Sequence, residues 1–198
     1  MIRLAREDIS GRASSQTFDS HLKSDPARLK ALQEDKEDFL PRGAHPVGTV
    51  RVDVSYERQL LHSATCWEGT ELKFPVTVDE PPSRGGDGAA PAPLSYFVLG
   101  AAACLLTQLA KLAMLDELKI NSMSMSARGH FNRKLGGTFS ELVFDVKISG
   151  AEKSARVKRL SRDAEGQCYA SNTLKKAVKL VTNIEYNGGL LLTLSSTP

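Results

Sequence analysis

Two cysteines of this chain stand in settings where a thiol can do chemistry. Cys104 lies inside an apolar run that follows a proline, and Cys168 begins a segment with the apolar spacing of a helix. One cysteine on a buried helix usually serves as a small apolar side chain. Two of them, downstream of an arginine-bearing strand, favour thiol redox chemistry, because a nearby cation stabilises the reactive thiolate.

The third cysteine, the histidines and a glycine-rich loop are residue types that bind metals or phosphates in other proteins, but their pattern here favours no such site. Cys66 stands beside Trp67 on a predicted strand, which is typical of a structural cysteine. The Gly-Gly-Asp-Gly loop at positions 85–88 precedes a helix but lacks the lysine of a phosphate-binding loop, so we interpret it as flexible. We expect no metal and no cofactor, because the histidines are scattered and none has ligand spacing with a cysteine: His21, His45, His62 and His130.

The composition is that of a globular protein. Of the 198 residues, 41% are hydrophobic and 25% are charged, which argues against disorder. A net charge of +3 is too small to indicate binding of nucleic acid. Basic residues outnumber acidic ones between Lys153 and Lys179, and we interpret them as a solvated helix face. An interaction site for an acidic partner is the weaker alternative.

Charge placement and cysteine content predict a soluble, cytoplasmic protein that neither enters a membrane nor leaves the cell. The first residues carry charges where a signal peptide needs apolar side chains. The longest uncharged apolar stretch, Tyr96 to Leu106, is about half of the roughly 20 residues that a membrane span requires. Three cysteines in a reducing compartment are poor material for a disulfide framework.

The chain divides into an N-terminal extension, residues 1–47, and a domain at residues 48–198. The extension is polar, with one short helix from Pro26 to about Phe39 that Asp25 begins as N-cap. Its few leucines are not enough for a separate core. A turn-rich linker at positions 43–48 then leads into the domain.

Hydrophobic periodicity in the first half of the domain predicts a sheet followed by a long helix. Alternation at Val50–Tyr56, about His62–Trp67 and Leu72–Val78 indicates an antiparallel meander whose first strand is half-buried. Pro93 then begins a helix that runs to about Leu118. Its first half is apolar on all sides, so we expect it to be buried.

The second half of the domain adds a hairpin, two helices and a strand. The hairpin pairs Ile120–Asn132 with Phe139–Ile148. A basic helix from Glu152 to about Ser161 is broken at Gly166, a second helix covers Cys168 to Leu180, and Leu190–Leu194 is a final strand. The whole pattern predicts an α+β fold.

These elements resemble the superfamily of osmotically inducible protein C (OsmC) and organic hydroperoxide resistance (Ohr) proteins. The resemblance covers about Thr49 to Leu194. It rests on the proline-led run Pro-Leu-Ser-Tyr-Phe-Val-Leu-Gly-Ala-Ala-Ala that ends at Cys104, and on the segment Gly-Gln-Cys-Tyr-Ala-Ser-Asn-Thr-Leu-Lys around Cys168. The spacing of 64 positions from Cys104 to Cys168 belongs to the same pattern.

The resemblance implies an OsmC-like fold and a tight, intertwined homodimer in which the cysteine-bearing helices meet near the subunit interface. It also implies thiol peroxidase activity on organic hydroperoxides, in oxidative-stress defence. Cys104 is then the peroxidatic cysteine, Cys168 resolves it as a disulfide, and Arg58, at the end of the first strand, activates the thiolate. A dithiol reductant, with a lipoyl-type dithiol as one candidate, restores the thiols.

The chain departs from the family pattern at one position. Active members carry a glutamate just after the proline of the long helix, where it orients the arginine, whereas here Leu94 follows the proline. Glu57, Glu68 and Asp87 are candidates to replace it. The alternative function is a catalytically weak or inactive OsmC-like protein that binds a small apolar ligand.

Overall fold

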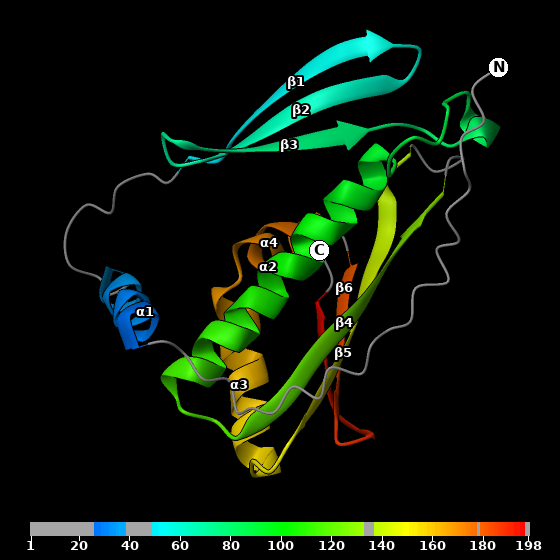
Figure 1. The fold of residues 1–198 in the computed structure, drawn as a ribbon. Helices are drawn as coiled ribbons and strands as arrows, with labels where there is room; N and C mark the ends of the chain where they lie inside the picture. Colours follow the sequence, from blue (N-terminus) through cyan, green and yellow to red (C-terminus); the bar gives the residue numbers. More distant parts are fainter. Residues whose placement is uncertain (1–25, 39–48, 133–136, 178, 197–198) are drawn as a thin grey trace, which may run out of the picture.

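The computed structural model describes residues 26–38, 49–132, 137–177 and 179–196. Its long central helix, α2 (Pro93–Leu115), passes between a three-stranded sheet and a four-stranded sheet (Figure 1). The α+β architecture predicted from the sequence is therefore confirmed. The predicted helix of the extension is present as α1 (Pro26–Asp38), which contacts α2, while Asp25 and the predicted linker lie outside the described residues.

The first sheet is the predicted antiparallel meander of β1 (Arg51–Arg58), β2 (Leu61–Glu68) and β3 (Leu72–Val78). Its register aligns apolar side chains in rows on one face, with Val52 opposite Cys66 and Cys66 opposite Phe74. Every residue of β1 is nevertheless exposed in the single chain, where the alternation predicts half-burial. The difference arises because no described element of the same chain covers the apolar face of this strand.

The second sheet has the order β4-β5-β6-β7. The predicted hairpin is confirmed as β4 (Ile120–Phe131) and β5 (Phe139–Gly150), which pair in antiparallel fashion. Strand β6 (Lys179–Tyr186) pairs in parallel with β5, and β7 (Gly189–Ser196) returns antiparallel to β6. One face of this sheet forms the core with α2 and α3, and its fully buried side chains include Leu142, Phe144, Val146, Leu180 and Ile184.

Among the described residues, the buried side chains of helix α2 lie along one face. Pro93 occupies its first position, where a missing backbone N–H removes no helical hydrogen bond. Side chains at helical spacing are buried in the core: Ala101, Leu105, Leu109, Leu112 and Ala113. Nearer the start of the helix, Phe97 and Leu99 are exposed at 46% and 60%. By length and composition alone α2 could cross a membrane, a test that core helices also pass.

Helix α3 (Ser154–Gln167) is longer than its predicted counterpart. The sequence predicts a break at Gly166, but the helix continues through that residue. Its buried face explains the difference, because Val157, Leu160 and Ala164 keep helical spacing past Ser161 and pack into the core. A glycine near the end of such a helix is therefore tolerated.

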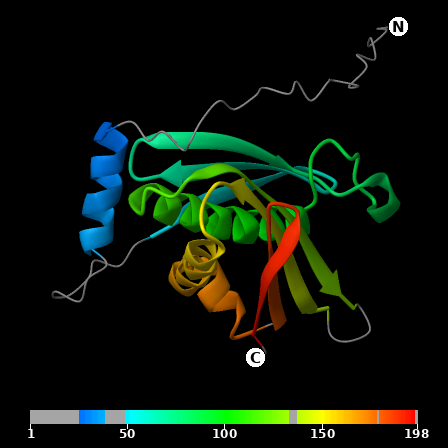
Figure 2. The same cartoon turned by 90° about the horizontal axis from the view of Figure 1, so that it is seen from below.

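The predicted helix from Cys168 to Leu180 is wrong. Helix α4 (Tyr169–Leu174) ends early, and Lys179 begins strand β6. Within that strand Leu180, Thr182 and Ile184 are buried in alternation, which is the period of a strand. Cys168 consequently lies at the junction of α3 and α4 and not inside a long helix (Figure 2 shows α3 in gold and α4 in orange, below α2).

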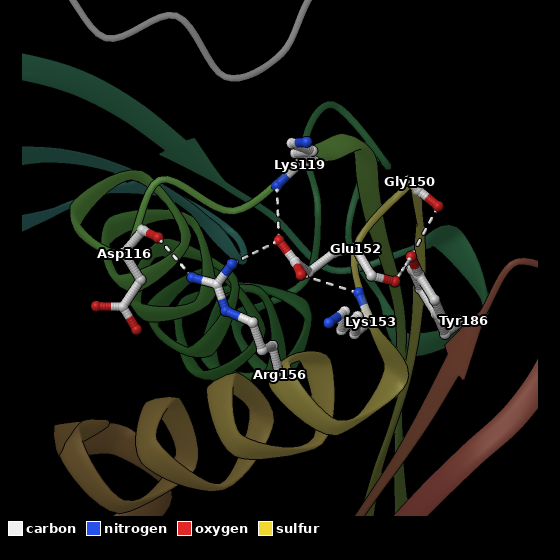
Figure 3. A network of polar contacts seen from close by, with 7 residues as sticks. All are labelled: Asp116, Lys119, Gly150, Glu152, Lys153, Arg156 and Tyr186. Carbon is white, nitrogen blue, oxygen red and sulfur yellow. Dashed lines mark hydrogen bonds and ion pairs between the residues drawn. The ribbon is translucent and has the colours of Figure 1, made fainter.

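A polar network fastens the end of α2 to the start of α3 (Figure 3). The Glu152 carboxylate accepts hydrogen bonds from the backbone N–H groups of Lys153 at 2.9 Å and Lys119 at 3.3 Å, and it pairs with the Arg156 guanidinium at 2.9 Å. Arg156 also donates to the carbonyl of Asp116 at 2.9 Å. These contacts, the Lys153 N–H foremost, lower the pKa of Glu152.

Candidate active site

The two cysteines singled out in the sequence lie side by side. Cys104 comes from the middle of α2 and Cys168 from the α3–α4 junction, and their Sγ atoms are 3.3 Å apart. Both are free thiols, Cys168 fully buried and Cys104 partly exposed. A disulfide bond is about 2.05 Å long, so a small approach of the two sulfurs would join them.

The surroundings raise the pKa of Cys104. Burial raises the pKa of its thiol, and the neighbouring Cys168 raises the pKa as well. Backbone N–H groups of Ala170 and Tyr169, in the first turn of α4, act in the opposite direction because they donate to the sulfur. The balance favours the neutral thiol, so a thiolate at this position calls for a cation that the described residues of one chain do not bring to it.

The sulfur of Cys168 is held by the helix that follows it. Cys168 is the N-cap of α4, and its Sγ accepts the backbone N–H of Ser171 at 3.4 Å. An N-cap side chain satisfies one of the free N–H groups at the start of a helix. The same contact fixes the direction of the thiol, which points toward Cys104.

Arg58, the third predicted site residue, lies elsewhere in the single chain. Its Nη1 forms an ion pair with Oδ2 of Asp87 at 3.0 Å, and the two side chains are 63% and 43% exposed. Among the described residues, neither Cys104 nor Cys168 has a hydrogen bond or electrostatic contact with Arg58. The structure thus brings together two of the three predicted residues, and it selects Asp87 from the three acids considered as partners of the arginine.

A buried aspartate gives the loop of Asp87 its shape. Asp79 is 1% exposed, and its carboxylate accepts backbone N–H groups of Glu80 at 2.8 Å, Asp87 at 3.0 Å and Ala89 at 3.0 Å. These hydrogen bonds, that of Ala89 foremost, lower the pKa of Asp79. At Gly86 a Cβ would lie 1.9 Å from the Glu80 carbonyl oxygen, so the turn needs glycine. The loop predicted to be flexible is organised around this carboxylate.

Sequence reasoning missed Gln108. It lies on α2 one turn after Cys104, and its Nε2 donates to the carbonyl of Gln167 at 3.0 Å. A polar residue in the amphipathic half of a helix is ordinarily solvated, so its type and position alone carry no signal. Only the tertiary contact with the residue before Cys168 reveals it.

A cavity of about 480 Å³ lies between the first half of α2 and the second sheet. Its lining is largely apolar and includes Leu94, the residue that stands where the family has a glutamate. Arg84 also lines it and pairs with Glu80 at 3.2 Å. Ligand sites are typically apolar cavities with a few polar groups, and this cavity has that character. Its apolar lining includes Leu94, Val98, Leu99, Met125, Phe131 and Phe139.

Fold and site together define a class, an α+β domain in which two free cysteines meet between a long central helix and a short helical junction. A sequence model of the OsmC-like protein family matches residues 85–183, half of the chain, and includes both cysteines. This chain belongs to the OsmC-like family. Helix α2 contributes buried side chains to the core of this domain. No curated protein sequence matches the chain.

Solved structures of OsmC-like proteins share the fold. An OsmC-like protein from Mycoplasma pneumoniae has a TM-score of 0.60 at 20% identity, with 71% of this chain and 99% of that chain covered. An organic hydroperoxide resistance protein OsmC from Legionella pneumophila has a TM-score of 0.55 at 20% identity, covering 71% and 98%. An organic hydroperoxide resistance protein from Elizabethkingia anophelis, with thiocyanate bound, has a TM-score of 0.58 at 18% identity, covering 73% and 100%.

Proposed function

We propose that this protein is a thiol peroxidase that reduces organic hydroperoxides in oxidative-stress defence, with Cys104 peroxidatic and Cys168 resolving. The observation that carries the proposal is the 3.3 Å separation of the two free sulfurs at the edge of an apolar core. Structures of similar fold named organic hydroperoxide resistance proteins support the same chemistry here. Apolar surroundings suit an alkyl or lipid hydroperoxide better than a small polar oxidant.

The proposed cycle balances in three steps. The Cys104 thiolate attacks the distal peroxide oxygen, the O–O bond breaks, and the alcohol leaves with a proton while Cys104 becomes a sulfenic acid. The Cys168 sulfur then attacks the sulfenic sulfur, which forms a disulfide and releases water. A dithiol, of which a lipoyl-type dithiol is one candidate, reduces that disulfide through two exchange steps and is itself oxidised to a disulfide.

Arg58 supplies the activating cation in this proposal. The pKa of Cys104 is raised by burial, and an opposite charge within about 4–6 Å lowers a thiol pKa. Asp87 takes the place of the family glutamate as the partner of the arginine, since it forms the 3.0 Å ion pair with Arg58. Leu94 has no group that could do so.

The proposal also requires a homodimer, for which the exposed apolar surface is the support. In the single chain Val54 and Phe74 on the first sheet are 62% and 51% exposed, and Leu99 on α2 is 60% exposed. Apolar surface gathered on facing elements marks an interaction site. A second copy would cover it and would bring Arg58 to a cysteine pair. We further expect the assembled protein to act in the cytoplasm, where dithiol reductants maintain free thiols.

The test is to treat reduced protein with one equivalent of cumene hydroperoxide and to map disulfides by mass spectrometry. We expect a Cys104–Cys168 bond, and a Cys168→Ser variant should retain a Cys104 sulfenic acid that dimedone labels. Cys66→Ser serves as the matched control, because this third free cysteine lies on β2 and should leave the reaction unchanged. Wild-type protein that stays fully reduced under these conditions excludes the peroxidase.

A second function has one observation in its favour. The cavity of about 480 Å³ lined by Leu94 is large enough to hold a small apolar molecule, and Leu94 makes it more apolar than a glutamate would. The same fold would then bind a ligand, with its cysteines structural. This function would be favoured if the protein binds an apolar fluorescent probe, if Leu94→Glu weakens that binding, and if Cys104 does not react with hydroperoxide.

A further inference from the structure

The contact between α2 and the α3–α4 junction gives one side chain a place in the chemistry of the cysteine pair. Gln108 follows Cys104 by four residues, and side chains so spaced lie on the same face of a helix. Its Nε2 donates to the Gln167 carbonyl at 3.0 Å, and Gln167 directly precedes Cys168. One hydrogen bond therefore connects the turn after the first cysteine to the residue before the second.

Apart from the contacts that reach the Cys104 sulfur itself, the other hydrogen bonds at the end of α3 have local origins. The carbonyls at a helix C-terminus lack helical partners and need others. At the end of α3 the Glu165 carbonyl accepts the Cys168 N–H at 3.3 Å, and the Gly166 carbonyl accepts Nδ2 of Asn172, on α4, at 2.8 Å. These contacts set the internal shape of the junction. The bond from Gln108 comes from α2, so it helps to set the position of the junction relative to Cys104, together with the N–H groups of Ala170 and Tyr169 that donate to the Cys104 sulfur.

We propose that Gln108 is a positioning residue for the resolving step: it holds the Cys168 sulfur within reach of Cys104, so that the disulfide forms before the sulfenic acid is oxidised further. Disulfide formation needs the two sulfurs to approach by roughly 1.2 Å, and the rate of such a step depends on how closely its reactants are held. The peroxide part of this inference rests on the proposed function. The positioning of the two thiols does not.

The test uses the full chain with Gln108→Leu, which keeps the size of the side chain and removes the donor. The first measurement is the equilibrium of the Cys104–Cys168 disulfide with a buffer of reduced and oxidised dithiothreitol, which involves no peroxide. Loss of one net hydrogen bond corresponds to a change of about three- to tenfold, so we expect the disulfide of the variant to be reduced that much more readily. Thr107→Ala, an exposed neighbour on α2, is the matched control.

The second measurement is the peroxide concentration at which Cys104 is overoxidised. A merely structural role of Gln108 would not change this concentration selectively. With increasing cumene hydroperoxide, Gln108→Leu should accumulate Cys104 sulfinic acid at a several-fold lower peroxide concentration than wild type, read by intact mass. Gln108→Glu, which cannot donate to a carbonyl, provides a second variant and should behave the same way. A folded variant with the wild-type dithiothreitol equilibrium and the wild-type overoxidation dose overturns the proposal.

The two proposals fail in different ways. If wild-type protein forms the disulfide with oxidised dithiothreitol but not with hydroperoxide, the peroxidase is excluded, and the dithiothreitol equilibrium of Gln108→Leu still decides the role of Gln108. If hydroperoxide forms the disulfide in wild type, while Gln108→Leu keeps the wild-type dithiothreitol equilibrium and the wild-type overoxidation dose, the peroxidase stands and the positioning role does not.

Discussion

At the scale of the residue, the proposed reactivity of Cys104 depends on Arg58, which pairs with Asp87, while Leu94 stands at the position of the family glutamate. The Arg58–Asp87 pair is 3.0 Å long and well exposed, so it contributes little to folding; exposed pairs are worth about 0–1 kcal/mol. Its value lies in orientation, since the backbone N–H of Asp87 is itself fixed by the buried Asp79. A carboxylate on a fixed loop can hold a long side chain that would otherwise sample many rotamers.

This arrangement predicts the behaviour of Asp87→Asn, which removes the charge and keeps the shape. Arg58 loses its partner, so we expect the second-order rate of Cys104 oxidation by cumene hydroperoxide to fall about threefold to fivefold, the change for an exposed ion pair. The midpoint of the pH profile for alkylation of Cys104 by iodoacetamide should move upward, because the thiolate loses stabilisation.

The control for this prediction is Asp163→Asn. Asp163 pairs with Arg159 on α3 at 3.4 Å, and the exposed fractions, 45% and 77%, are similar to those of the Asp87 pair. It should leave both the rate and the pH profile unchanged. An active wild-type protein whose Asp87→Asn variant keeps the same rate and profile would show that Arg58 is oriented by another group.

At the scale of the element, the sequence predicts what local patterns decide and misses what pairing decides. The hairpin of β4 and β5 and the start of α2 at Pro93 follow from alternation and from the fixed backbone of proline. The segment from Lys175 to Leu180 fits a helix face equally well, but α4 ends at Leu174 and Lys179 begins β6, where β5 offers a parallel partner. Pairing partners distant in sequence leave no local trace.

The same limit applies to the candidate site. The two cysteines could be singled out from the sequence, because the short segments around them show both their apolar surroundings and the family resemblance. The ion pair of Arg58 with Asp87 and the bond from Gln108 to Gln167 join segments that are 29 and 59 residues apart. Their residue types are common on any surface, so only the folded chain distinguishes them.

The Glu152 network predicts a pH-dependent contribution to the stability of the junction between α2 and α3. Its pKa is lowered in the folded state, so the stabilisation is present above the ordinary carboxyl pKa of about 4.3 and is lost as the pH falls through the lower folded value. We expect Glu152→Gln to lower the Tm by about 5 °C at pH 7. That difference should shrink as the pH falls below the ordinary carboxyl pKa.

Thermal unfolding followed by circular dichroism measures this difference at each pH. Glu185→Gln is the matched control, because Glu185 meets Lys147 at a longer 3.7 Å across two strands. Its Tm should stay near that of wild type throughout. A Glu152→Gln deficit that is the same at pH 2.5 as at pH 7 would show that packing and not the charge of Glu152 is responsible.

At the scale of the whole molecule, the single chain is incomplete as the proposed catalyst, and its exposed apolar surface is incomplete for the same reason. The cysteine pair lacks a cation, Arg58 lies away from it, and the apolar sides of α2 and of the first sheet lack a cover among the described residues (Figure 1). A second copy would meet both needs at once. The proposed dimer and the proposed activity should therefore fail together.

Phe74→Asp tests this coupling. Phe74 is 51% exposed in the single chain, so an aspartate there leaves the monomer fold intact, whereas in a dimer it would bury an unpaired carboxylate at a cost of about 3–5 kcal/mol. Light scattering should give twice the 21.5 kDa chain mass for wild type and the chain mass itself for the variant. We expect the rate of Cys104 oxidation to fall at least tenfold in the variant, about the effect of losing a cation beside a thiolate.

Ser55→Asp, in the row of Ser63 and Thr77 on the opposite face of the sheet, should keep both the dimer and the rate. A monomeric Phe74→Asp protein with the wild-type rate would mean that one chain brings Arg58 to its own cysteines, and a monomeric wild type would remove the dimer from the mechanism.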